Sequence, residues 1–116
     1  MTKVFVLMKF KNDMEDISFK AKGLLSKQSL IYTISDHTKF KLNLTDSYFI
    51  KEDAESLLYL SYNDHPYLKY TLKENNFVFK EVIEILYKSL TANSFKIMYL
   101  FNKQKFCYEV SWKVET

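Results

Sequence analysis

FKIMYLF (residues 95–101), NKQK (102–105) and FCYEVSWKV (106–114) together predict a β-hairpin near the end of the chain. In the second arm, Phe106–Val114, apolar residues alternate with mostly polar ones. Successive side chains of a strand point to opposite faces, so one face of this arm is apolar and the other is polar. The apolar face consists of Phe106, Tyr108, Val110, Trp112 and Val114. This pattern predicts an all-β fold.

Strand-like segments recur along the rest of the chain, separated by short polar breaks. They are Val4–Phe10, Ile17–Leu24, Leu30–Ile34, Lys39–Leu44, Ser47–Lys51, Leu57–Tyr62, Tyr67–Leu72 and Phe77–Phe79. Many short strands joined by polar turns are typical of a β-barrel or sandwich, and a closed barrel leaves no edge strands. We therefore predict one domain over residues 1–116, an antiparallel barrel of about eight to ten strands. Gly23 indicates a bulge or a bend.

The segment Lys80–Leu90 admits two interpretations. As a helix it would stack Val82, Leu86 and Leu90 on one side, as an amphipathic helix requires. As a strand it would use the sheet preference of valine and isoleucine. The barrel prediction therefore leaves room for one short helix. The alternative fold is α+β, with a helix at residues 80–90 packed against an antiparallel sheet.

Composition limits the function classes. The 116 residues suit one core, and 47% are hydrophobic, including ten Phe, nine Tyr and one Trp, which argues against disorder. All 17 basic residues are lysines, so no guanidinium can clamp a carboxylate or phosphate. A single glycine excludes glycine-rich phosphate loops. The net charge of +3 neither demands nor excludes an anionic partner.

The compartment is predicted from three observations. The apolar run Val4–Met8 is followed at once by Lys9, so it is shorter than the apolar core of a secretory signal. No segment approaches the ~20 apolar residues of a membrane-spanning helix. Cys107 is the single cysteine, which excludes an intrachain disulfide. We expect a cytoplasmic protein with no membrane partner.

The order of the segments resembles a family of small uncharacterised bacterial proteins with a calycin-like β-barrel, related to the lipocalins. The resemblance lies in the early strand Ile17–Gly23, which ends at a glycine, in the middle run of hairpins, and in the strand Val82–Ser89 before the final hairpin Phe95–Val114. It covers most of residues 4–114. It implies a barrel that binds a small ligand, and it brings no established catalytic residues.

An aromatic interior is the candidate binding site. Rings with a few hydroxyls are typical of small-molecule pockets, although narrow barrels are instead filled by their own side chains. The predicted interior wall is Tyr62, Tyr70, Tyr99, Phe106, Tyr108 and Trp112, with Tyr59 and Tyr67 as further members. We predict a small apolar or amphipathic ligand and no cofactor.

Catalytic and metal sites are not expected. His37 and His65 each follow an aspartate in a predicted turn. They could bind a metal only if the two turns met at one end of the barrel, and they are weak candidates because ordinary turn residues look the same. Cys107 lies on the polar face, and no Gly-x-Ser-x-Gly motif is present. We predict no catalytic residue and no enzymatic activity.

Two kinds of macromolecular partner are alternatives. Lysines alternate with aromatic residues at 39–41, 67–70 and 95–96, and such surfaces can bind single-stranded nucleic acid. Strand alternation produces the same pattern automatically, so nucleic acid is not the expected partner. The alternative function is a non-catalytic module that binds protein or single-stranded nucleic acid. Exposed rings would also suit a homodimer.

Overall fold

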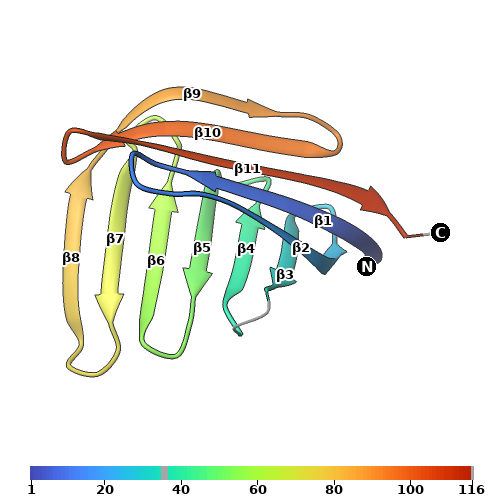
Figure 1. Cartoon of the computed structure of the whole chain (residues 1–116), viewed down its shortest axis with the longest axis horizontal. Coiled ribbons are helices and arrows are strands. Elements are labelled where there is room, and N and C mark those ends of the chain that lie inside the picture. The colour runs from blue at the N-terminus through green and yellow to red at the C-terminus, as the bar shows by residue number, and fades with distance from the viewer. Residues whose placement is uncertain (35–36, 116) are drawn as a thin grey trace.

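A computed structural model describes residues 1–34 and 37–115, and all of its strands belong to one antiparallel sheet (Figure 1). The strands are β1 Thr2–Lys11, β2 Asp16–Leu25, β3 Ser29–Thr33, β4 Lys39–Asn43, β5 Tyr48–Glu52, β6 Ser56–Ser61, β7 Tyr67–Leu72, β8 Phe77–Val82, β9 Glu84–Leu90, β10 Ser94–Phe101 and β11 Gln104–Val114. The described residues contain no helix. The predicted antiparallel barrel is confirmed, although it has eleven strands where eight to ten were expected, and the α+β alternative is wrong.

The sheet curls into a nearly closed barrel made of two layers. The strand order is β8-β7-β6-β5-β4-β3-β2-β1-β11-β10-β9. Neighbouring strands in the sheet are therefore consecutive in the sequence, except for the pair β1 and β11. In Figure 1, β9, β10, β11, β1 and β2 run across the upper part of the view, at a steep angle to β3–β8. Layers that cross in this way are joined where strands pass from one layer to the other.

One passage between the layers occurs at Ile83, the single residue between β8 and β9. These two strands are the opposite ends of the sheet, so the main chain itself connects them. Ile83 is buried, and its N–H donates to the carbonyl of Pro66 at 3.3 Å. The helix considered for residues 80–90 is absent. The three residues that would have formed its buried side, Val82, Leu86 and Leu90, are 80, 43 and 48% exposed.

The other passage lies in β2 at Gly23. Along β2 the pairing with β1 is unbroken, but only Gly23–Leu25 pair with β3. A Cβ at Gly23 would lie 2.9 Å from the carbonyl oxygen of Ile31 and 3.0 Å from Val6 Cγ2. Of the two alternatives predicted for Gly23, a bulge or a bend, the bulge is wrong because the register with β1 does not shift there. The glycine is needed because two backbones approach each other closely.

The final hairpin is confirmed, with a shorter turn than predicted. Its turn residues are Asn102 and Lys103, whose φ angles are 52° and 64°. Two central residues with positive φ define a type I′ turn, which matches the twist of the flanking strands. In β11 the alternation is also confirmed for Tyr108, Val110 and Trp112, which are buried, whereas Val114 at the strand end is exposed.

The interior has a packed end and a hollow end. At the packed end, apolar side chains fill the space between the layers; they include Val4, Val6, Leu30, Phe95, Ile97, Val110 and Trp112. Tyr108 lies at the boundary, with ring centroids 4.8 Å from Phe49 and 6.1 Å from Phe40. Beyond Tyr108, toward the final turn, the side chains of the two layers no longer meet and a cavity begins.

Candidate functional site

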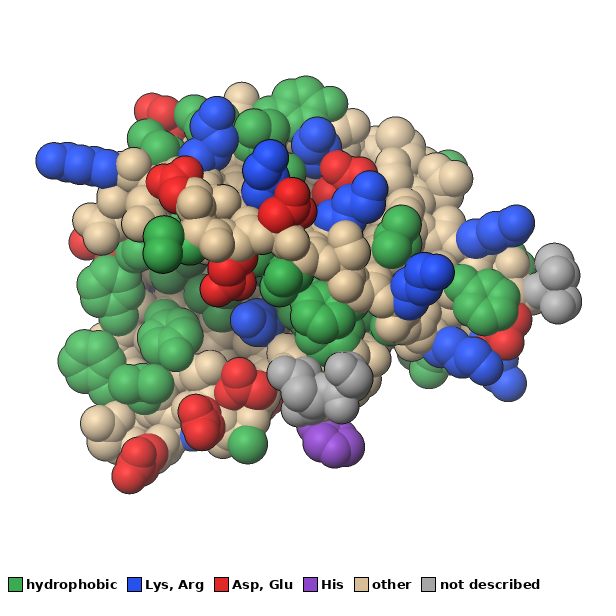
Figure 2. Space-filling model, in the orientation of Figure 1, with side chains coloured by type: hydrophobic (Ala, Val, Ile, Leu, Met, Phe, Trp, Pro, Cys, Tyr) green, Lys and Arg blue, Asp and Glu red, His purple; other side chains and the backbone are tan. Residues whose placement is uncertain are grey.

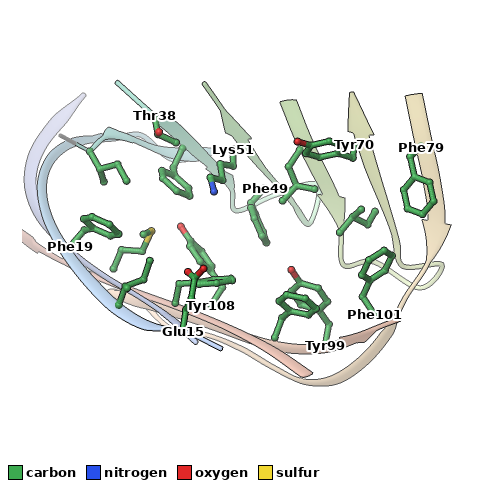
Figure 3. Close-up of a pocket in the computed structure, with 18 residues that line it drawn as sticks. Glu15, Phe19, Thr38, Phe49, Lys51, Tyr70, Phe79, Tyr99, Phe101 and Tyr108 are labelled. Carbon is green, nitrogen blue, oxygen red and sulfur yellow. The ribbon is translucent and has the colours of Figure 1, made fainter. Parts of the chain in front are cut away.

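The hollow end contains a cavity of about 500 Å³, which is within the roughly 300–1,000 Å³ typical of ligand sites (Figure 3). Twelve of its eighteen lining residues are fully apolar. They are Met8, Phe10, Ile17, Phe19, Ile34, Phe40, Phe49, Leu58, Leu68, Phe79, Phe101 and Phe106. The other six are three tyrosines, Thr38, Glu15 and Lys51. The cavity is thus an apolar container with a small number of polar groups.

One wall is a row of side chains that crosses the layer from β4 to β8. Register places Phe40, Lys51, Leu58, Tyr70 and Phe79 opposite one another on successive strands. All five line the cavity. Directly paired residues of an antiparallel sheet point to the same face, so the row follows from the register alone. Lys51 is the only charged member of this row.

The facing wall comes from β1, β2, β10 and β11. Tyr99 and Phe106, which are paired across β10 and β11, stack their rings at 5.3 Å. Phe101 contacts Phe106 and also meets Phe79 of the first wall, edge to face, at 6.0 Å. The two layers therefore touch again beside the cavity, at the side where β8 continues into β9.

The tyrosine hydroxyls of this wall are neutral hydrogen-bonding groups. Burial raises the pKa of Tyr99 and of Tyr108 far above the ordinary value. The Tyr108 hydroxyl is hydrogen-bonded to that of Tyr32, while no described residue bonds to the Tyr99 hydroxyl, which points into the cavity in Figure 3. A phenol with so high a pKa does not serve as a general base at neutral pH, but it can donate a hydrogen bond to a ligand.

Glu15 and Lys51 mark the mouth of the cavity, since both line it and both are exposed to solvent. Glu15 lies in the turn between β1 and β2. Its N–H donates to Asn12 Oδ1 at 2.8 Å, and the Asn12 N–H donates to its carbonyl at 2.9 Å. Lys51 enters from β5, on the opposite layer (Figure 3). No ion pair joins these two side chains in the described part of the chain.

Four of the six predicted wall residues line the cavity, and two do not. Tyr70, Tyr99, Phe106 and Tyr108 are among the lining residues. Tyr62 and Trp112 are buried at the packed end instead. Tyr62 donates its hydroxyl to the carbonyl of Asn43 at 3.0 Å, and burial raises its pKa to about 12. The indole N–H of Trp112 has no partner among the described residues.

Tyr59 and Tyr67 were expected inside and lie outside. On β6, Leu58 and Leu60 point inward, so Tyr59 between them points outward. Its ring stacks on Tyr48 at 5.1 Å and contacts that of Tyr67 at 5.8 Å. These two tyrosines were predicted to be inside because they are aromatic, whereas the alternation of residues along the strand assigns Tyr59 to the outer face. The same alternation identifies Lys51, which was not among the candidates, as an inward residue two positions after Phe49.

The two histidines lie at opposite ends of their layer. A meander alternates its turns between the two ends, so the β3–β4 turn with His37 and the β6–β7 turn with His65 cannot share one end (Figure 1). The expectation that they could meet is wrong. Asp36 lies outside the described residues. Residues 1–34 and 37–115 contain no group of three or more His, Cys, Asp or Glu side chains placed to hold a metal.

Cys107 and the lysine–aromatic motifs show no site of their own. Cys107 is half-buried on the outer face, where burial raises the pKa of its thiol, so little nucleophilic thiolate forms at neutral pH. At residues 39–41 the ring of Phe40 points inward and its lysine neighbours point outward.

The described residues include no helix of the length and apolarity needed to span a membrane.

No protein-family profile matches the chain, and no curated protein is significantly similar to it. The nearly closed antiparallel barrel is consistent with the calycin-like fold expected from the resemblance. Membership of that family and a bacterial origin stay predictions. The function must therefore be inferred from the geometry of the cavity.

Proposed function

We propose that the protein binds a small apolar or amphipathic molecule in the cavity at the hollow end of the barrel. The observation that carries the proposal is the cavity itself: about 500 Å³ between two layers, with twelve apolar residues among the eighteen that line it. Pockets for small molecules are mostly apolar and carry a few placed polar groups. The three tyrosines, Thr38, Glu15 and Lys51 supply those groups.

The contrast with the packed end supports a ligand site over a packing defect. Protein interiors are close-packed, and a void forfeits the dispersion contacts of every atom that lines it. This barrel packs Phe95, Ile97 and Val110 to at most 1% exposure. The same sheet leaves Phe101 and Phe106 only partly covered. A ligand in the cavity would supply the missing contacts.

The position of the polar groups suggests how a ligand would lie. Both charged residues are at the mouth, whereas the inner surface is aromatic and aliphatic. The apolar part of an amphipathic molecule would enter the cavity and its polar part would stay near Lys51 and Glu15. The Tyr99 hydroxyl would bond to a polar atom farther inside.

A fluorescence titration with N-phenyl-1-naphthylamine, a neutral apolar probe, tests the proposal. We expect enhanced, saturable emission with the unmodified protein. Leu58→Trp would extend a larger ring into the cavity from the centre of the β4–β8 row and should weaken binding about tenfold or more, which corresponds to roughly 1.4 kcal/mol. Leu57→Trp is the matched control, since Leu57 is the neighbouring residue on the outer face of β6.

Two results would contradict the proposal: no saturable probe binding by the unmodified protein, or equal binding by Leu58→Trp and the control. Both variants should first be shown to keep the β-sheet circular dichroism signal, so that loss of the fold is not mistaken for loss of the cavity.

A second candidate function, binding of another protein chain, is favoured by the exposed edge strand β8. All of its residues are exposed, among them Phe77, Val78 and Val82 at 54, 51 and 80%. Figure 2 shows hydrophobic side chains gathered over β7 and β8, while lysine and acidic side chains intermingle over β10 and β11. An apolar edge can add a strand from a second copy. Light scattering that finds only monomers at high concentration would exclude this homodimer.

A further inference from the structure

We infer that the ligand carries an acidic head group, a carboxylate or a similar single anion, which pairs with the ammonium of Lys51 at the mouth of the cavity. The inference rests on the proposed function and adds the chemical class of the ligand. It also assigns the two charged lining residues opposite effects: Lys51 attracts the head group, and Glu15 limits the affinity.

The place of Lys51 in the sheet is the first support. Its partners across β4 and β6 are Phe40 and Leu58, which line the cavity on either side of it. A lysine in an apolar row can cover its neighbours with its methylene stem while its ammonium stays in water. In Figure 3 its nitrogen points toward the space between the layers. The ammonium is therefore presented to whatever fills the mouth.

The second support is that Lys51 has no carboxylate partner within the described residues. Described ion pairs involve Lys22 with Glu115, Lys73 with Glu52, and Lys96 with Glu109. Asp53, two residues farther along the chain, accepts the N–H groups of Glu55 and Ser56 at 2.9 and 2.8 Å through Oδ1. These hydrogen bonds and, to a smaller extent, the charge of Lys51 lower the pKa of Asp53, but no direct ion pair joins the two side chains. The Lys51 ammonium is left available to an external anion.

Glu15 makes the inference more specific. Its backbone is held by hydrogen bonds with Asn12, and its exposed side chain lines the same mouth. Like charges repel and opposite charges attract, so an anionic head group at the mouth would be repelled by the Glu15 carboxylate and attracted by the Lys51 ammonium. Neutralising one residue should therefore raise affinity for an acid, and neutralising the other should lower it.

A competition experiment tests this inference separately from the proposed function. Decanoic acid, decanol and decylamine have the same chain and differ in the head group. Each would displace N-phenyl-1-naphthylamine from the unmodified protein below its micelle concentration. We expect the acid to bind about three- to tenfold more tightly than the alcohol, as suits an ion pair that is partly open to solvent.

Variants assign the preference to its residue. Lys51→Met should abolish the acid-over-alcohol preference, measured as the ratio of the two affinities within the same variant, while Lys51→Arg should keep the preference. Glu15→Gln should increase it. Lys69→Met removes a lysine from the outer face of β7 and should have no effect. Added salt should reduce the preference in the unmodified protein.

The outcomes separate the two claims. Equal binding of acid and alcohol, or an unchanged preference in Lys51→Met, overturns the acidic head group while the apolar cavity still binds its ligand. A preference for decylamine that disappears in Glu15→Gln overturns it in favour of a cationic head group. If the probe binds saturably but none of the three compounds displaces it, the inference fails and the proposed apolar site stands. If the probe itself does not bind, the proposed function fails as well.

Discussion

The packed end and the hollow end of the barrel are built from the same strands with the same alternation, yet only one is filled. On β10, Phe95 and Ile97 are 1% and 0% exposed, while Phe101, farther along the same face, borders the cavity. On β11, Val110 and Trp112 are buried, and Phe106 borders the cavity. Alternation decides which face a side chain occupies. The separation of the two layers decides whether that face is filled.

The largest change in stability is expected when one aromatic ring is removed from each end in turn. Phe95→Ala should lower the free energy of unfolding by about 3–5 kcal/mol, because it opens a void at the packed end. Phe101→Ala, on the same strand, should cost only about 1–2 kcal/mol, because its ring is already partly uncovered. Urea unfolding followed by circular dichroism measures both. Equal costs would mean that the hollow end is as tightly packed as the other.

A smaller effect is expected at the passage between the layers. Gly23→Ala places a Cβ 2.9 Å from the carbonyl oxygen of Ile31, and the backbone shift that relieves this contact should cost about 1–3 kcal/mol. Lys22→Ala, the adjacent outward residue of β2, is the control and should change the stability little. If Gly23→Ala proves as stable as the control, close backbone approach does not hold the layers together there.

The smallest effect concerns alkaline stability. Burial raises the pKa of Tyr62 at the packed end from 10.0 to about 12. The unfolded chain releases this proton first, so the contribution is fully present below pH 10 and is lost as the pH rises toward 12. The unfolding free energy, measured by urea titration over this range, should fall less steeply in Tyr62→Phe. Tyr87→Phe, which removes the hydroxyl of a ring that is 49% exposed, is the matched control.

Most of the strand positions could be predicted from the sequence, because a strand with one buried face alternates its residues. This worked for the hairpin and for segments such as Lys39–Asn43, where Phe40 and Leu42 are buried. For residues 80–90 it left a helix and a strand as alternatives. There β8 and most of β9 are exposed. Apolar residues such as Val82 therefore indicate a preference for strand structure and do not mark a buried face.

The candidate site was predictable in part for a related reason. Tyr70, Tyr99 and Tyr108 lie on inward positions that alternation identifies, and the same logic assigns Tyr59 to the outside. The division between packed and hollow ends was not predictable. It depends on how far the layers separate, and the alternation of residues along a single strand carries no information on that distance.

At the junction around Ile83, the barrel is closed by the main chain and by side chains instead of by strand pairing. No backbone ladder joins β8 to β9. Among the described contacts across that seam are the Ile83–Pro66 hydrogen bond, the bond from Lys88 Nζ to the Tyr62 carbonyl at 2.9 Å, and the Phe79–Phe101 ring pair. Widening the seam would therefore break these contacts but no backbone ladder, so we expect the barrel to open here before any paired strands separate.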